Sequence, residues 1–141
     1  MIASEETLRH LMIKAQGGDK LCYSSLLTEC EKWLRRYYAR KINPAAIDDL
    51  VQETLISLHR KRASYDPARA FLPWLEDVTA KASLERLLGM IPSRQAEVIS
   101  LVKIEGLTIN EAAAMTGQSE TLVKVNIHRG LKRMSALIES E

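Results

Sequence analysis

The chain has 141 residues, 46% of them hydrophobic, and a formal net charge of +2. That length predicts one domain or two very small ones, and the apolar content excludes a disordered chain. No apolar run reaches the ~18 residues that a membrane span requires. The 6 glycines and 4 prolines are too few for a fibrous or low-complexity protein.

Three helices are expected before residue 62, each with its own start signal. Ser4 and Asp19 can cap the first and second, and Asn43-Pro44 starts the third, with Pro at the first helical position. Gly17-Gly18 ends the first helix. The spacing of apolar residues predicts three buried stripes: Leu8, Leu11, Met12 and Ala15; Leu26, Leu27, Cys30, Leu34 and Tyr37; and Ile47, Leu50, Val51, Thr54, Leu55 and Leu58.

A loop and a fourth helix follow. Residues 63–70 contain Asp66-Pro67, which indicates a turn, and the fourth helix is expected to start at Pro73 and to open with Trp74-Leu75. Trp74 is interpreted as a core anchor because apolar residues flank it. No segment shows the two-residue alternation of a half-buried strand, so the predicted fold class is all-α.

The second half of the chain predicts three shorter helices. Ser93 is expected to cap the first, and Gly106 to end it. Thr108 and Glu111 form a capping box at the start of a helix over 109–115, in which each side chain satisfies a free backbone donor. The residues available for burial are Val98, Ile99, Leu101 and Val102 in the first helix, and Leu122, Val123, Ile127, Leu131, Met134 and Leu137 in the last.

Residues 108–133 have the form of a helix-turn-helix. Ala112 and Ala113 are small enough for two helices to cross closely, and Gly117 allows a left-handed turn at low cost. The last helix fits the major groove of DNA, with cations on phosphates. A three-helix packing unit with a solvated basic face is the alternative. The candidate DNA-binding residues are Ser119, which can also cap the helix, Thr121, Lys124, Val125, His128, Arg129 and Lys132.

An acidic, amide-bearing patch is expected on the third helix. Asp48, Asp49, Gln52 and Glu53 lie opposite its apolar stripe. Paired carboxylates can serve acid–base catalysis, but no nucleophile, metal set or phosphate-cradling loop accompanies them, so no enzyme activity is expected. From the residues alone, a docking surface for a basic partner and a merely solvated face remain equally open.

Neither metal nor disulfide chemistry is indicated. Cys22 and Cys30 lack CxxC spacing and a nearby histidine, and His10, His59 and His128 are scattered. We therefore expect no cofactor, two cysteines that behave as small buried apolar residues, and a reducing, cytoplasmic location. The acidic, polar start of the chain is unlike a secretory signal.

The aromatic residues mark a domain boundary. All seven lie between Tyr23 and Trp74, and the 67 residues that follow contain none. This change in composition predicts two small helical domains, residues 1–75 and 93–141. A lead-in over 76–92 would join them.

In these motifs the chain resembles the extracytoplasmic-function (ECF) group of bacterial RNA polymerase sigma factors. AQGGDKLCYSSLLTEC and DDLVQETLISLHRKRASYDPARAFLPWL are similar to region 2 of that family. IPSRQAEVISLVKIEGLTINEAAAMTGQSETLVKVNIHRGLKRM is similar to region 4. The resemblance covers nearly the whole chain, and the two motifs in this order are highly specific.

The resemblance implies a transcription initiation factor that directs core RNA polymerase to promoter −10 and −35 elements. The helix with Asp48, Asp49, Gln52 and Glu53 would dock on the β′ clamp helices of the polymerase. The second domain would read the −35 element and touch the β flap. The loop 63–70 resembles the one that captures a flipped base. An anti-sigma factor would hold the two domains and hide both polymerase-facing surfaces.

The chain departs from the family pattern after Leu75. In the family, FLPWL runs on into a longer basic helix and a flexible linker, whereas here Glu76 to Lys81 lead directly towards the second domain. A few tens of residues, including much of what recognises and melts the −10 element, are expected to be absent. They are either deleted or left out of the numbered chain.

Two other functions remain open. A sigma-like decoy would bind an anti-sigma factor without promoter DNA. The missing basic helix favours the decoy, and the intact Lys124, His128, Arg129 and Lys132 argue against it. A plain helix-turn-helix repressor would leave the DDLVQET surface and the FLPWL segment unexplained.

Overall fold

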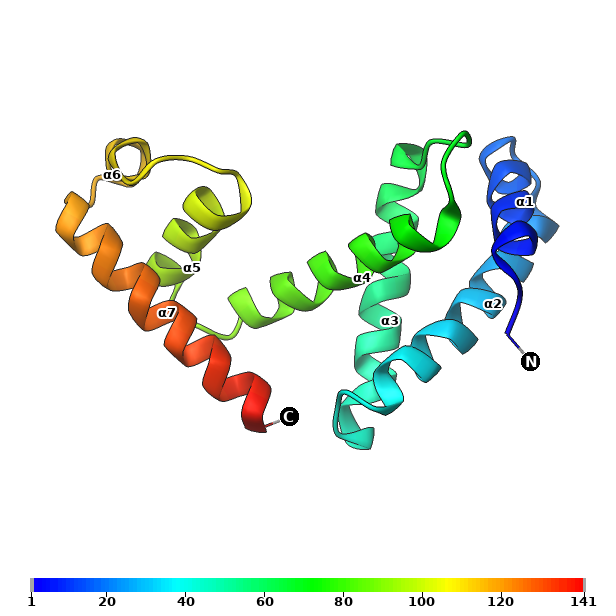
Figure 1. Ribbon diagram of the computed structural model, residues 1–141, viewed down its shortest axis with the longest axis horizontal. Helices are drawn as coiled ribbons and strands as arrows, with labels where there is room; N and C mark the ends of the chain where they lie inside the picture. The colour runs from blue at the N-terminus through cyan, green and yellow to red at the C-terminus, as the bar shows by residue number, and fades with distance from the viewer. Residues whose placement is uncertain (1, 141) are drawn as a thin grey trace. The chain divides into compact units, whose positions relative to one another are not determined.

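The computed structural model describes residues 2–140, and every regular element within them is helical (Figure 1). The predicted all-α class is confirmed, and none of these helices is long and apolar enough to cross a membrane. Of the two short elements, η1 is a 3₁₀ turn and η2 a π-helical turn. The elements are α1 (Glu5–Gln16), α2 (Lys20–Ala39), α3 (Pro44–Lys61), η1 (Arg62–Ser64), α4 (Phe71–Leu88), α5 (Ser93–Ile99), η2 (Ser100–Ile104), α6 (Ile109–Thr116) and α7 (Glu120–Ser140).

The chain forms two compact units, Met1–Ser83 and Leu84–Glu141, each with its own hydrophobic core. Two separate cores agree with the predicted class of two small helical domains. The first unit buries Leu8, Met12, Leu26, Cys30, Leu58, Tyr65, Phe71, Leu75 and Val78, with a further cluster of Leu34, Tyr38, Leu50 and Val51. The second unit buries Ile91, Val98, Ile99, Ala112, Val123, Ile127 and Met134.

Helix α4 occupies most of the segment 76–92, for which the sequence indicated a shortened lead-in. It continues because Leu75, Val78 and Ala82 recur at helical spacing and are buried. Its last turn, Leu84 to Leu88, packs against the core of the second unit. Residues 89–92 then connect α4 to α5.

The predicted caps of α1 and α2 and the predicted start of α3 at Pro44 are confirmed. The hydrogen bond that the Asp19 carboxylate accepts from the Cys22 N–H also lowers the pKa of Asp19, because it favours the ionised form. Each capping oxygen accepts a hydrogen bond from a backbone N–H two or three residues later: Ser4 from Thr7 at 3.2 Å, Asp19 from Cys22 at 3.0 Å and Asn43 from Ala45 at 3.0 Å.

The start of α4 differs from the prediction. The helix begins at Phe71 rather than at Pro73, so Pro73 lies in its first turn. The reason is a carboxylate from another helix: Glu5 accepts hydrogen bonds from the backbone N–H groups of Phe71 and Leu72. Because a residue of another helix accepts the hydrogen bonds of the first α4 N–H groups, the sequence around Phe71 contains no capping residue that would predict this start.

Most residues of the predicted stripes of α1 to α3 are buried, but Leu11, Ala15, Leu27, Ile47 and Leu55 are only half-buried, and the end of α2 differs. Tyr37 is half-buried, stacking on Trp33 with ring centroids 5.1 Å apart, and the Lys41 ammonium lies 3.7 Å from its ring centre. Tyr38 takes the central position at 2% exposure. Its hydroxyl lies 3.1 Å from Thr54 Oγ1, which allows the phenol to be buried without an unpaired polar atom.

The two cysteines have different surroundings. Cys30 is fully buried, and burial raises the pKa of its thiol to about 12. Cys22 is half-exposed in the first turn of α2, so the expectation that both are buried was wrong for Cys22. The first turn of α2 projects past the core, as the 82% exposure of the neighbouring Leu21 shows.

The second unit confirms the capping box and corrects one cap. Thr108 and Glu111 each accept a backbone hydrogen bond from the other at 3.1 Å. Ser93 does not cap α5, because it is already the first helical residue. The carbonyl of Pro92 accepts the first hydrogen bonds instead, and the fixed backbone angle of proline favours that start.

The buried face of α7 is narrower than predicted. Leu122 and Leu131 are 38% and 42% exposed, because the face that meets α5 and α6 runs through Val123, Ile127 and Met134 at helical spacing. Gly130 lies on that face and is buried. A Cβ atom at Gly130 would lie 2.4 Å from Cδ1 of Ile99, so the glycine permits a close crossing of α5 and α7.

Candidate functional site

The candidate DNA-binding residues lie on α7 and at its cap. Six of them are exposed, and Val125 is half-buried. Thr121, Lys124 and His128 follow one another at intervals of three and four, so they share one side of the helix. Lys132 continues that side. This solvent-facing surface, the α7 face, comprises Thr121, Lys124, Val125, His128, Arg129 and Lys132.

Ser119 has a structural role at the start of the α7 face. Its Oγ accepts a hydrogen bond from the Leu122 N–H at 3.1 Å. Asn110 on α6 donates to Glu120 Oε1 at 2.6 Å, which links the first turn of α7 to the preceding helix. The start of α7 is therefore fixed by side chains on both sides of the turn.

The turn between α6 and α7 is held by a left-handed glycine and a buried amide pair. Gly117 has φ +73°, a conformation that glycine adopts without a Cβ clash. Gln118 and Asn126, both under one tenth exposed, are joined by a hydrogen bond from Asn126 Nδ2 to Gln118 Oε1 at 2.7 Å. The apolar pattern missed this pair, although Asn126 lies between two residues of the buried stripe.

The acidic patch on α3 is exposed, opposite a buried face of Val51, Thr54 and Leu58. Asp48, Asp49, Gln52 and Glu53 all reach solvent. Asp48 differs from the others because its Oδ1 accepts a hydrogen bond from Arg35 Nη1 on α2 at 2.7 Å. Asp48 is thus partly engaged within the unit. The same contact raises the pKa of Arg35.

An exposed hydrophobic residue extends this patch. Ile56 is 51% exposed and lies three residues after Glu53 and four after Gln52, on the same side of α3. We define the α3 face as Asp49, Gln52, Glu53 and Ile56. A single exposed apolar side chain is common on protein surfaces, so Ile56 adds apolar contact area to this patch without distinguishing a docking surface from a solvated one.

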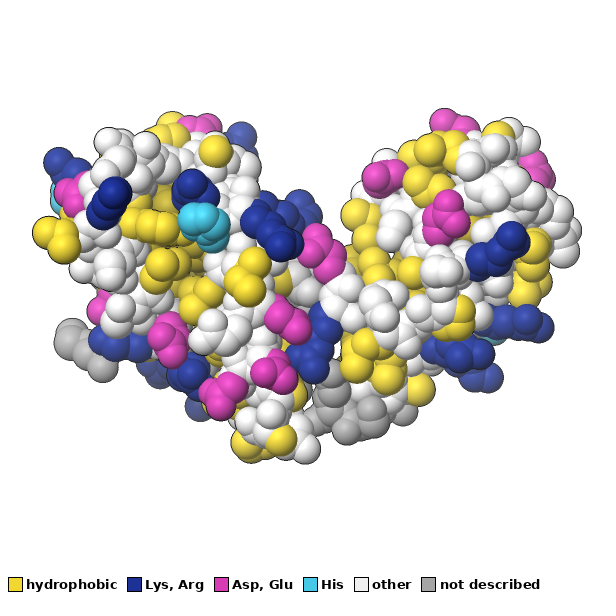
Figure 2. All heavy atoms as spheres, turned by 180° about the vertical axis from the view of Figure 1, so that it is seen from behind, with side chains coloured by type: hydrophobic (Ala, Val, Ile, Leu, Met, Phe, Trp, Pro, Cys, Tyr) yellow, Lys and Arg dark blue, Asp and Glu magenta, His cyan; other side chains and the backbone are white. Residues whose placement is uncertain are grey.

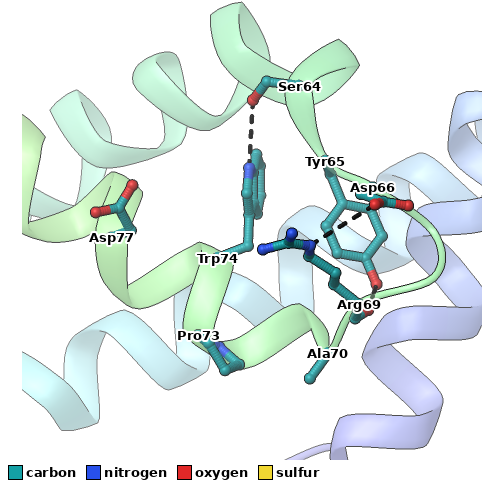
Figure 3. Close-up of a pocket in the computed structure, with 8 residues that line it drawn as sticks. All are labelled: Ser64, Tyr65, Asp66, Arg69, Ala70, Pro73, Trp74 and Asp77. Atoms are coloured by element: carbon teal, nitrogen blue, oxygen red, sulfur yellow. Dashed lines mark hydrogen bonds and ion pairs between the residues drawn. The ribbon is translucent and has the colours of Figure 1, made fainter.

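The loop between α3 and α4 borders an open pocket of about 520 Å³, here called the loop pocket (Figure 3). Two aromatic rings form its wall: Tyr65, which is 3% exposed, and Trp74, with ring centroids 5.6 Å apart. Trp74 Nε1 donates a hydrogen bond to Ser64 Oγ at 3.3 Å. The residues that line the loop pocket are Ser64, Tyr65, Asp66, Arg69, Ala70, Pro73, Trp74 and Asp77.

Trp74 therefore has two roles. It packs partly buried against the first core, as the prediction of a core anchor required, and it also lines the pocket. Burial raises the pKa of the Tyr65 phenol, whose hydroxyl donates to the Arg69 carbonyl. The Nε atom of Arg69 lies 3.7 Å from Oδ2 of Asp66, with which it forms an ion pair. Aromatic faces beside a cation and hydrogen-bonding groups suit a planar, polar-edged ligand.

No group of three or more His, Cys, Asp or Glu residues that could hold a metal ion occurs in residues 2–140.

Two family models match this chain. The model described as Sigma-70 region 2 matches residues 22–88, and the one described as Sigma-70, region 4 matches residues 81–134. The two matches share residues 81–88, so no residue separates them. The region 2 match extends through α4, beyond Leu75.

Curated relatives match over nearly their whole length. The chain is 32% identical over 171 residues to the ECF RNA polymerase sigma factor SigF of Caulobacter vibrioides, which covers 96% of each chain. It is 22% identical to the RNA polymerase sigma factor CarQ of Myxococcus xanthus, over 90% of this chain and 95% of the relative. Since this chain has 141 residues, at least 30 positions of the SigF alignment face gaps in it.

Two solved structures are also similar. One is that of CnrH in complex with the cytosolic domain of CnrY, with 26% identity, a TM-score of 0.46 and coverage of 96% of this chain and 99% of that chain. The other is the RsbN–BldN complex, with 22% identity, a TM-score of 0.43 and coverage of 89% and 98%. The identification of the chain rests on the sequence matches.

Proposed function

This chain belongs to the ECF family of RNA polymerase sigma factors, and from that premise we propose which of its surfaces perform the work of a transcription initiation factor. The supporting observation is that one chain carries a helix-turn-helix with an exposed basic face and, on a separate unit, an exposed acidic and apolar face. Both are binding surfaces. The protein acts in the cytoplasm, without catalytic activity of its own.

The second unit binds duplex DNA of the −35 type through the α7 face. Lys124 and His128 lie on the side of α7 opposite the buried stripe and within its first two to three turns, where base edges are read. Arg129 and Lys132 flank them and bind phosphates. The buried Gln118–Asn126 pair supports this assignment because it ties α7 to the turn that precedes it.

The first unit docks on core RNA polymerase through the α3 face, on the β′ clamp helices that the family uses. Asp49, Gln52 and Glu53 provide the charge and amide groups, and Ile56 provides apolar contact area. Asp48 contributes less than the others, because docking would compete with its hydrogen bond to Arg35. The second unit touches the β flap.

The loop pocket accepts an unpaired base of a melted promoter strand. Base–aromatic stacking needs an exposed ring face, and Trp74 supplies one at the edge of the first core. Arg69 offers donors to the base edge or the adjacent phosphate, whereas the Ser64 hydroxyl already donates to the Lys61 carbonyl. Asp66 and Asp77 offer acceptors.

An anti-sigma factor controls the protein by covering such surfaces. Figure 2 shows hydrophobic side chains reaching the surface of both units among charged ones. We infer that such a partner uses these exposed side chains as apolar contact area. The large exposed hydrophobic residues are Leu21, Ile56, Met90, Ile104, Met115, Leu122, Leu131 and Ile138.

Binding of the full chain to core polymerase, with and without promoter DNA, tests this function. We expect a stable complex with core polymerase alone, and added protection of −35 DNA when the promoter is present. A chain that binds promoter DNA but not the polymerase would be a repressor. A chain that binds neither would contradict the proposal.

One observation favours a second function, that of a decoy for an anti-sigma factor. The SigF alignment leaves at least 30 positions without a counterpart here, and the two family matches meet without a linker. Lys81, one of two cations in the segment 76–92, is paired with Asp77 at 3.0 Å. Permanganate footprinting of a promoter with core polymerase and this chain distinguishes a sigma factor from a decoy. A decoy leaves the promoter DNA strands paired.

A further inference from the structure

Helix α1 holds the loop pocket from outside the region that the family model recognises. The region 2 match begins at residue 22, whereas α1 ends at Gln16. Three α1 side chains nevertheless make six hydrogen bonds to the backbone of residues 62–72, here called the pocket segment. This segment supplies most of the pocket's lining.

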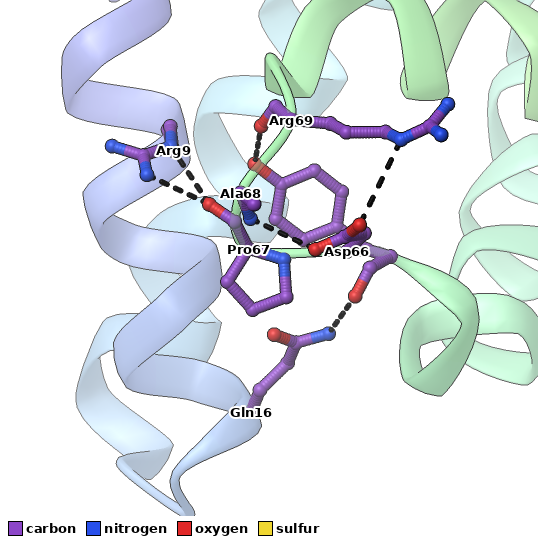
Figure 4. A network of polar contacts seen from close by, with 7 residues as sticks. Arg9, Gln16, Asp66, Pro67, Ala68 and Arg69 are labelled. Carbon is purple, nitrogen blue, oxygen red and sulfur yellow. Dashed lines mark hydrogen bonds and ion pairs between the residues drawn. The ribbon is translucent and has the colours of Figure 1, made fainter.

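Arg9 and Gln16 hold the middle of the pocket segment (Figure 4). Arg9 donates to the carbonyl of Pro67 from both Nε, at 3.0 Å, and Nη2, at 2.7 Å. Gln16 Nε2 donates to the carbonyls of Arg62 and Tyr65, each at 2.9 Å. A carbonyl that accepts two donors of one guanidinium is fixed in direction as well as in position.

Glu5 holds the end of the pocket segment, where α4 begins. Its Oε2 accepts from the Phe71 N–H at 3.0 Å and its Oε1 from the Leu72 N–H at 2.8 Å. The residue before the helix, Ala70, has no side-chain acceptor, and Pro73 has no N–H. Glu5 therefore caps α4 across the fold, and its negative charge suits the helix N-terminus.

The spacing of these residues explains how one short helix reaches the whole segment. Positions 5, 9 and 16 fall on one side of α1, next to the stripe of Leu8 and Met12, which are fully buried. The buried stripe anchors α1 in the same core as Tyr65 and Phe71. The polar row beside it is thereby aligned with the loop.

We propose that Glu5, Arg9 and Gln16 are positioning residues that pre-organise the loop pocket for an unpaired base; this inference rests on the proposed function of that pocket. The pocket segment is bound to α1 through its backbone, which leaves the side chains of Tyr65, Asp66 and Arg69 to line the pocket (Figures 3 and 4). A loop ordered in advance loses less conformational entropy when a ligand binds.

The test compares two variants of the full chain that each remove one positive charge from α1. Arg9→Met removes the two hydrogen bonds to Pro67, and Lys14→Met removes an exposed charge elsewhere on the helix. Each protein is titrated, at one salt concentration, with a labelled single-stranded DNA of mixed sequence and with the matching duplex. We expect Arg9→Met to weaken single-strand binding about three- to tenfold relative to Lys14→Met, with equal duplex binding. Equal single-strand affinities would overturn the inference.

Two variants of Glu5 provide an independent test of the same inference. Glu5→Gln keeps an oxygen acceptor for the α4 N–H groups, whereas Glu5→Leu keeps none. Single-strand affinity is expected to fall most for Glu5→Leu and less for Glu5→Gln, which keeps one of the two acceptor oxygens. Hydrogen exchange at the amides of residues 68–72 should rise more in Glu5→Leu than in Glu5→Gln. If both variants bind as the parent does, Glu5 has no positioning role.

A pocket variant separates this inference from the proposed function. Trp74→Leu keeps an apolar group in the core but removes the stacking face, and it should weaken single-strand binding about tenfold. If Trp74→Leu has no effect, the base-binding role of the pocket is wrong. If Trp74→Leu weakens binding while the α1 variants do not, the pocket role stands and the positioning role falls.

Discussion

Asn126 on α7 donates a hydrogen bond from its side-chain amide to the side-chain oxygen of Gln118 at 2.7 Å, and both residues are buried. Gln118 immediately follows the left-handed glycine of the turn, so this bond ties the middle of α7 back to the turn that begins it. In a buried environment each partner depends on the other, because water does not replace a lost one.

Replacing Gln118 should therefore destabilise the second unit. Gln118→Leu leaves the Asn126 amide unpaired, and we expect a loss of about 1–3 kcal/mol in the free energy of unfolding. Hydrogen exchange of the α7 amides measures it. Asn110→Ala is the matched control, since it removes an exposed hydrogen bond to the same helix and should cost less than about 0.5 kcal/mol. Comparable losses in the two variants would contradict a special role for burial.

The crossing of α5 and α7 at Gly130 should tolerate no large side chain. A Cβ atom there already meets Ile99 at 2.4 Å and Gln95 at 3.2 Å, so Gly130→Leu should cost about 1–3 kcal/mol through overpacking. Ser135→Leu places the same side chain on an exposed position of α7 and should be near neutral. All aromatic residues lie in the first unit, so tryptophan fluorescence should show unchanged unfolding of that unit in both variants.

Variants of the α7 face should distinguish residues that contact bases from residues that contact phosphates. Lys124→Ala should reduce discrimination between promoter sequences, whereas Lys132→Ala should weaken all sequences alike and reduce the salt slope by about one unit. Titrations of two promoters over a range of salt concentrations measure both effects. Lys103→Ala, an exposed cation outside the α7 face, serves as the control. An unchanged sequence preference in Lys124→Ala would remove the base-reading role of Lys124.

Charge reversal on the α3 face should abolish polymerase docking without unfolding the protein. Asp49 and Glu53 are exposed, so changing both to Lys should leave the helical circular dichroism unchanged. Affinity for core polymerase should fall by about 2 kcal/mol or more, if the two carboxylates are desolvated against cations. The paired control is Glu6→Lys with Glu76→Lys, two exposed acids away from this face. Intact docking by the Asp49 and Glu53 variant would exclude the α3 face as the docking surface.

Acid should weaken the capping box of α6. Hydrogen bonds from the backbone and hydroxyl of Thr108 hold the pKa of Glu111 below its ordinary 4.5. The ionised carboxylate therefore stabilises the second unit fully above about pH 4.5, and this contribution is lost as the pH falls through the lower pKa of the folded state. Glu111→Gln should remove that part of the acid dependence, measured by hydrogen exchange of the α6 amides between pH 3 and 6.

The acid profile of the parent chain provides the comparison. If α6 amides in the parent and in Glu111→Gln lose protection in parallel as the pH falls, Glu111 does not contribute to the acid sensitivity of the unit. Asp19 caps α2 in the first unit, and hydrogen bonding lowers its pKa in the same way. The amides of α2 therefore offer an internal reference.

The sequence by itself determined the features that depend on near neighbours. The caps at Ser4, Asp19 and Thr108 and the turn at Gly117 each involve residues within four positions of one another. Local hydrogen bonds and backbone preferences decide such features wherever the segment lies. For the same reason the helix-turn-helix, and with it the exposure of Lys124 and His128, could be predicted. The binding roles of these residues remain predictions.

Only the tertiary structure decided which residues meet across the fold. Glu5 caps a helix that begins 66 residues later, and no local pattern connects Glu5 with Phe71. Likewise, helical periodicity placed Tyr37 on a buried stripe, but the partner Thr54, on another helix, favours Tyr38. Leu122 and Leu131 are exposed because the direction in which α5 and α6 cross α7 sets the width of its buried face. These contacts depend on how helices pack, and the intrinsic preferences of a single helix do not contain that information.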